Sequence, residues 1–127
     1  MLMEAFAEFG AEMRRGTDDL FIVRYKSLDY YLDLDESAEA FCLIEVVVGM
    51  NGDLSERDYE VMMSVLKEFH PECDGDWNDG YPYICSQWYS INDEHGEYNS
   101  ARLEKIFKDF FKIWTFACAN ASLASQQ

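Results

Sequence analysis

The order of apolar and polar residues predicts helices in three parts of the chain. Apolar side chains at helical spacing predict a helix over residues 2–14, and they are Leu2, Phe6, Phe9 and Met13. A second helix is predicted over residues 55–69, because Ser55 and Asp58 have the spacing of a capping box. A third is predicted from residue 99 or 100 to about residue 119, with an apolar stripe formed by Leu103, Ile106, Phe107, Phe110 and Trp114.

Two segments between the first and second predicted helices are open to two interpretations. Residues 18–35 alternate apolar and polar side chains as a pair of strands does, although part of the segment also falls on a helical stripe. We favour a small hairpin there. Residues 38–50 follow Ser37, which can cap a helix, and we expect a helix. The β-branched residues 46–48 favour a buried strand instead.

Together these elements predict a mainly α fold, a small bundle of four to five helices with the N-terminal β-hairpin attached. The alternative is an α+β fold. The length of 127 residues is that of a single domain. Within residues 1–127 we expect a helix and hairpin over 1–35, a helical core over 36–119 and a frayed tail over 120–127.

The charge of the chain is strongly acidic, with 25 acidic and 10 basic residues and a formal net charge of −15. This balance argues against direct binding of nucleic acid, whose phosphates need lysine and arginine, and against an anionic membrane surface. No stretch approaches the roughly 20 apolar residues of a transmembrane helix, and the first residues lack the basic segment of a signal peptide. We therefore expect a cytoplasmic protein whose four cysteines stay reduced.

One segment concentrates the acidic charge together with large aromatic side chains. Residues 68–101 contain eight acids and no lysine or arginine. The aromatics among them are Phe69, Trp77, Tyr81, Tyr83, Trp88, Tyr89 and Tyr98. Tyrosine and tryptophan anchor protein interfaces, and a field of one sign steers a partner of opposite charge. The alternative is an ordinary acidic domain that buries these aromatics in its core.

Motifs for metal binding and catalysis are absent or incomplete. Residues 74–80 are rich in Asp and Gly, but the glycine falls one place late for a calcium loop and Cys85 stands where the bidentate Glu is needed. A zinc site would have to use His70, Cys73, Cys85 and His95, whose second pair lacks zinc spacing. No phosphate loop, nucleophile elbow or H-E-x-x-H motif is present. We expect no catalytic residues, no metal and no cofactor.

Several motifs after residue 34 resemble a known family. Residues 35–43 and 55–59 are acid-rich helix entries, and His70-Pro71 is followed by an Asp-containing loop and Tyr81-Pro82. In this order they resemble the colicin/pyocin nuclease immunity proteins. Those proteins have two paired tyrosines before the proline, and Gly80 stands here in the place of the first. The resemblance implies a small four-helix cytoplasmic protein that neutralises a bacteriocin nuclease, with residues 100–114 as its last helix.

A rival resemblance rests on two turns that each precede a predicted helix. Asn51-Gly52-Asp53 and His95-Gly96-Glu97 are similar to the Asp-Gly-Glu turns of TerB-like tellurite-resistance proteins. That resemblance implies a helical, cation-binding stress-response protein. Asn and His replace the leading Asp here.

The function we expect is that of an acidic inhibitor of a basic nuclease or other nucleic-acid-binding protein. Its setting would be toxin immunity or phage anti-defence, as in an anti-CRISPR protein or DNA mimic. The residues expected to select the partner are Glu56, Asp58 and Glu60. The acids expected to meet its lysines and arginines are Asp74, Asp76 and Asp79. The aromatic anchors are expected to be Trp77, Tyr81 and Tyr83.

Overall fold

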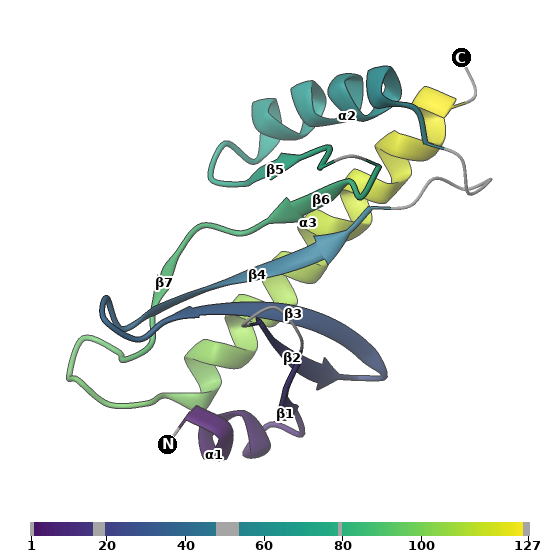
Figure 1. The fold of residues 1–127 in the computed structure, drawn as a ribbon. Helices are drawn as coiled ribbons and strands as arrows, with labels where there is room; N and C mark the ends of the chain where they lie inside the picture. Colours follow the sequence, from purple (N-terminus) through teal and green to yellow (C-terminus); the bar gives the residue numbers. More distant parts are fainter. Residues whose placement is uncertain (1, 17–19, 48–53, 79, 126–127) are drawn as a thin grey trace. The chain divides into compact units, whose positions relative to one another are not determined.

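A computed structural model describes residues 2–16, 20–47, 54–78 and 80–125 (Figure 1). The described residues form three helices, which are α1 (Leu2–Ala7), α2 (Glu56–Phe69) and α3 (Ser100–Ser125). They also form seven strands, which are β1 (Glu12–Arg15), β2 (Leu20–Tyr25), β3 (Leu28–Asp35), β4 (Ala40–Val46), β5 (Asp74–Asp76), β6 (Tyr83–Cys85) and β7 (Tyr89–Ser90). None of the helices among these residues is long and apolar enough to cross a membrane.

The strands form one antiparallel sheet with the order β1-β2-β3-β4-β6-β5, and β7 pairs with β4. The prediction of a mainly α bundle is therefore wrong, and the alternative α+β class agrees with the observed mixture. The expected helical core over residues 36–119 also contains strands β5, β6 and β7, and two of the predicted helices are wrong in part. The first ends early, and the segment expected to be a helix over residues 38–50 contains strand β4 at Ala40–Val46.

The first helix stops at Ala7 because the next residues form a glycine-terminated helix end. Gly10 has a φ of +81°, and its N–H donates to the carbonyl of Ala7 at 3.1 Å. The N–H of Ala11 donates to the carbonyl of Phe6 at 3.0 Å, which completes a Schellman motif. Met13, predicted on the helical face, is instead a buried residue of strand β1.

Strand β4 occupies most of the segment expected to be a helix. Ser37 does not cap a helix, because its hydroxyl donates to the Asp35 carboxylate at 2.7 Å in the turn before β4. The strand pairs with β3 from Ala40 to Ile44. The strand alternative is therefore correct for Ala40–Val46, and residues 48–50 of this prediction lie outside the described residues.

Three predicted elements are confirmed. Strands β2 and β3 form the expected hairpin, in register from Leu20 opposite Asp33 to Tyr25 opposite Leu28. Helix α2 begins after Ser55, whose hydroxyl accepts a hydrogen bond from the Asp58 N–H at 3.1 Å. Helix α3 begins as predicted at Ser100 but runs to Ser125, so the part of the tail before residue 126 is helical rather than frayed.

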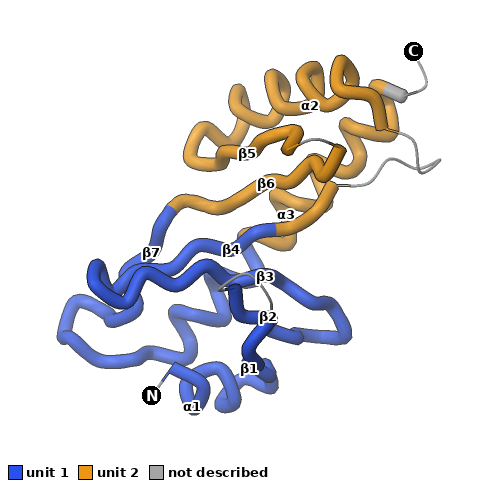
Figure 2. The backbone as a smooth tube through the Cα atoms, viewed as in Figure 1, with its two compact units in different colours: residues 1–44, 88–109 blue, residues 45–87, 110–127 orange. Residues whose placement is uncertain are grey.

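The chain divides into two compact units (Figure 2). The first comprises residues 1–44 and 88–109, and aromatic rings dominate its core. Phe107 contacts Phe6 and Tyr30 edge to face, with ring centroids 5.4 and 5.3 Å apart. The Tyr25 hydroxyl donates to the Glu104 carboxylate at 2.9 Å.

The second unit comprises residues 45–87 and 110–127 and contains α2, β5, β6 and the second half of α3. Its fully buried side chains include Met62 and Leu66 of α2, Ile84 of β6 and Phe110 of α3. These side chains place α2 beside the β5–β6 hairpin. All the residues expected to bind a partner fall within this unit.

Candidate partner-binding site

Helix α2 and the β5–β6 hairpin contact each other closely at Tyr59 and Gly75. The Tyr59 hydroxyl donates to the carbonyl oxygen of Tyr83 at 2.6 Å. A Cβ atom at Gly75 would meet that same carbonyl oxygen, and it would lie 2.6 Å from the Tyr59 hydroxyl oxygen and 3.2 Å from Cε of Met63. Only glycine leaves room at this position between the β6 backbone and the Tyr59 side chain of α2.

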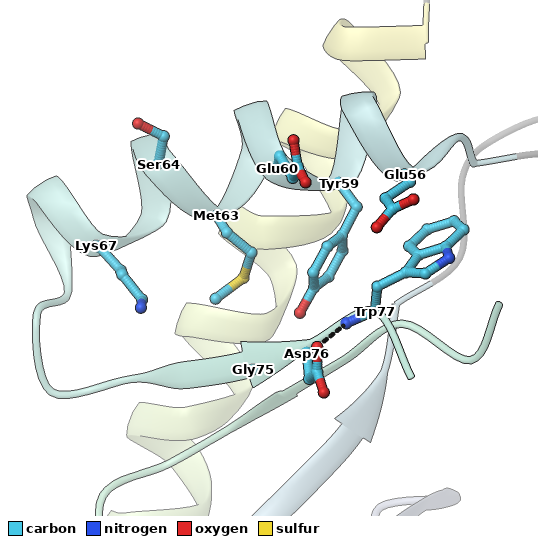
Figure 3. A pocket seen from close by; sticks show the side chains of 9 residues that line it. All are labelled: Glu56, Tyr59, Glu60, Met63, Ser64, Lys67, Gly75, Asp76 and Trp77. Carbon is cyan, nitrogen blue, oxygen red and sulfur yellow. Dashed lines mark hydrogen bonds between the residues drawn. The ribbon is translucent and has the colours of Figure 1, made fainter. Parts of the chain in front are cut away.

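Beside this contact lies an open pocket of about 330 Å³ (Figure 3). One face of α2 forms one side of it, through Glu56, Tyr59, Glu60, Met63, Ser64 and Lys67. The opposite side is formed by Gly75, Asp76 and Trp77, which lie on β5 and directly after it. The α2 residues recur at intervals of three and four, so they share one helical face.

Trp77 is fixed on this wall by packing against Tyr59. The two ring centroids are 5.7 Å apart and the ring planes are inclined by 54°. The Trp77 side chain is half-buried, and its backbone N–H donates to the Asp76 carboxylate at 2.8 Å. The indole therefore occupies a defined position before any partner arrives.

The charge around the pocket is negative. Glu56, Glu60 and Asp76 contribute three carboxylates, and Lys67 is the cation among the lining residues. The Lys67 ammonium lies 3.3 Å from the Asp74 carboxylate, which partly neutralises it. In Figure 3 the Glu56 carboxylate lies beside the Trp77 indole, whereas Lys67 lies at the opposite end. The acidic and aromatic end can attract a cation with a flat surface.

Hydrogen bonding keeps Asp74 ionised. Its carboxylate accepts the N–H of Gly75 at 2.9 Å. The pKa of Asp74 is lowered chiefly by this backbone hydrogen bond and further by Lys67. Asp74 therefore maintains the negative charge next to Lys67 well below neutral pH.

Burial holds three titratable groups of this unit, Tyr59, Cys73 and Cys85, in their neutral forms. Burial, reinforced by the charge of Asp76, raises the pKa of the Tyr59 hydroxyl, so it remains a hydrogen-bond donor. Burial raises the pKa of the Cys73 thiol to about 12 and also raises that of Cys85. Neither thiol is therefore a thiolate nucleophile at neutral pH.

Four of the predicted partner-binding residues line the pocket, and they are Glu56, Glu60, Asp76 and Trp77. Asp74 lies just beyond it in the ion pair with Lys67. Asp58 is half-buried in the first turn of α2, where its N–H is bonded to Ser55.

The remaining three predicted residues have different environments. Tyr81 is 71% exposed, as an anchor for a partner needs to be in the free protein. Tyr83 is half-buried, and its backbone carbonyl accepts the hydrogen bond from the Tyr59 hydroxyl. Asp79 lies outside the described residues.

Sequence reasoning missed five lining residues, which are Tyr59, Met63, Ser64, Lys67 and Gly75. Tyr59 is a buried residue of helix α2, and its ring also supports Trp77. The available signal was the helical spacing of Glu56, Glu60 and Lys67, which places three charges on the face beside Tyr59.

Metal ligands do not gather in the part of the chain that the structure describes. No group of three His, Cys, Asp or Glu side chains there is placed to hold an ion.

Comparison of the sequence with protein-family models, with curated proteins and with solved structures found no match. What the pocket binds is therefore inferred from its geometry and charge.

Proposed function

We propose that this protein binds and neutralises a basic nuclease or another basic nucleic-acid-binding protein through the pocket side of α2 and β5. The observation that carries the proposal is the meeting of Glu56, Glu60, Asp76 and Trp77 in one open pocket. Carboxylates beside a fixed aromatic ring are suited to the lysines and arginines with which such proteins contact phosphate.

The net charge of −15 supports the same proposal through the kinetics of encounter. A strongly negative protein accelerates association with a positive partner, and salt screens that attraction. Close contacts between aromatic and charged groups then determine the rate of dissociation. Fast, salt-dependent association and slow dissociation are what an inhibitor needs.

Two aromatic side chains supply the desolvated contacts in this proposal. Trp77 is already ordered against Tyr59, so binding requires little further loss of side-chain freedom. Tyr81 is 71% exposed and becomes buried only when a partner covers it. The proposed biological setting is toxin immunity or phage anti-defence, with an anti-CRISPR protein or DNA mimic as examples. The helical fold implied by the immunity-protein resemblance is not the fold observed, so the proposal rests on the surface alone.

Capture of the partner from the native cell, followed by kinetics on the purified pair, tests the proposal. The association rate constant should fall steeply as salt is raised from about 50 to about 500 mM. Tyr81→Ala should weaken the complex by more than about 1 kcal/mol. Tyr98→Ala is the matched control, because Tyr98 is a 43% exposed tyrosine of the other unit. A Tyr81→Ala effect no larger than that of Tyr98→Ala removes Tyr81 as an anchor.

The cation-binding alternative has less support. The turn at His95–Glu97 is accounted for by Asp93, whose carboxylate accepts the N–H groups of His95 at 2.8 Å and Glu97 at 3.0 Å. The other turn, residues 51–53, lies outside the described residues. Heat of binding in calorimetry of metal-free protein with Ca²⁺ or Zn²⁺ would favour this alternative over the inhibitor proposal.

A further inference from the structure

We propose that the pocket between α2 and β5 receives a single arginine side chain, with its guanidinium at the Trp77 end. This inference rests on the proposed function and specifies which partner group enters the site. The pocket combines a fixed indole, three carboxylates and one lysine at the far end (Figure 3).

The volume of the pocket limits what can enter. At about 330 Å³ it lies at the lower end of the range of roughly 300 to 1,000 Å³ found for small-molecule sites. It is open to solvent along the groove between helix and strand, so a side chain projecting from another protein can enter. One long side chain fits such a space better than a nucleotide cofactor does.

The aromatic wall favours a planar cation. Trp77 packs on Tyr59 with ring centroids 5.7 Å apart, which holds the indole in place. A guanidinium is flat, weakly hydrated and stacks on an indole face, whereas an ammonium is compact and strongly hydrated. The Trp77 wall therefore distinguishes arginine from lysine.

The carboxylates provide acceptors for the guanidinium N–H groups. Glu56 and Glu60 are one turn apart on α2, and Asp76 lies across the pocket on β5. One Asp76 oxygen accepts the backbone N–H of Trp77, which orients that carboxylate. The five N–H donors of arginine can be shared among several carboxylates, and charge-assisted hydrogen bonds of this kind are the stronger ones.

Lys67 makes the charge at the two ends of the pocket unequal. Its ammonium is held 3.3 Å from the Asp74 carboxylate and lies at the end away from Trp77. Like charges repel, so an entering cation is favoured at the Glu56 and Trp77 end. An anionic ligand would meet three carboxylates and a lysine that already has an acidic partner.

The experiment is an NMR titration of the ¹⁵N-labelled full chain with the blocked tripeptide acetyl-Gly-Arg-Gly-amide. The Trp77 indole N–H signal, assigned by its loss in Trp77→Phe, should shift on binding. The counterpart with citrulline, which keeps the shape but has no charge, should bind about tenfold more weakly, and the lysine peptide should also bind more weakly than arginine.

Matched variants locate the binding. The double substitution Glu56→Gln with Glu60→Gln should weaken arginine binding about fivefold, and Lys67→Gln should strengthen it. Glu68→Gln is the control, because Glu68 is an exposed acid of the same helix that does not line the pocket. Dispersed NMR spectra establish that each variant is folded.

The outcomes separate this inference from the proposed function. Equal binding of the citrulline and arginine peptides, or equal effects of the double variant and Glu68→Gln, overturns the arginine site. A captured basic partner that binds the double variant as tightly as the native protein also overturns it, while leaving the inhibitor proposal in place. Arginine binding at Trp77 by a protein that captures no basic partner supports the site and overturns the proposed function.

Discussion

Substitution of Gly75 by alanine tests the contact on which the pocket depends. The new methyl group would collide with the Tyr83 carbonyl oxygen and lie 2.6 Å from the Tyr59 hydroxyl oxygen. Overpacking costs about 1–3 kcal/mol. Loss of the hydrogen bond from the Tyr59 hydroxyl to Tyr83 costs about 1 kcal/mol more. Gly75→Ala should therefore lower the free energy of unfolding by about 2–4 kcal/mol.

Urea denaturation monitored by circular dichroism measures this loss, and Tyr59→Phe serves as a partner substitution. Tyr59→Phe alone should lower the free energy of unfolding by about 1 kcal/mol. Because the Tyr59 hydroxyl is one of the atoms in the collision, the double variant should lose less than the sum of the single losses. A Gly75→Ala loss below about 0.5 kcal/mol, the usual range for surface substitutions, would refute the crowding of Gly75 by the Tyr83 carbonyl and the Tyr59 hydroxyl.

Two further predictions concern a strained turn and a buried thiol. Lys26 and Ser27, between strands β2 and β3, both have positive φ, of 51° and 67°. Because glycine adopts this conformation without strain, Ser27→Gly should raise the free energy of unfolding by about 0.5 kcal/mol. Equal or lower stability of the variant in urea denaturation would contradict this prediction. Burial raises the pKa of the Cys73 thiol to about 12, so iodoacetamide at pH 8 should label Cys73 only after unfolding, and rapid labelling of the native protein would contradict this.

The elements that sequence reasoning located are those with local determinants. Helix α2 has its cap in Ser55, and α3 begins where the Asn99 side chain accepts the Arg102 N–H at 3.1 Å. The β2–β3 hairpin was found from alternation alone, since its turn at Lys26 and Ser27 lacks the usual glycine or asparagine.

The elements that were missed depend on longer-range pairing or on a competing signal. Strand β4 follows a serine suited to cap a helix, and its pairing with β3 and β7 decides its structure. Gly10 was the available signal for the end of α1, but the apolar spacing through Met13 concealed it. The strands that were not predicted all join the β2–β3 hairpin in one sheet, and this sheet makes the fold α+β rather than mainly α.

The candidate site was predictable in its charges but not in its shape. The acids and Trp77 stand out in the sequence, because residues 68–101 interleave acids with large aromatic side chains and contain no lysine or arginine. Gly75 is inconspicuous between two aspartates, and its role follows only from the positions of the Tyr83 carbonyl and the Tyr59 side chain in the structure. The pocket therefore required the structure.

The most direct test of the proposed function is the rate of association with the captured partner as a function of salt. The proposal predicts a basic partner whose association rate constant falls steeply between about 50 and about 500 mM salt. An association rate constant that is unchanged over this range would contradict the proposal that the acidic charge of this protein recognises a basic one.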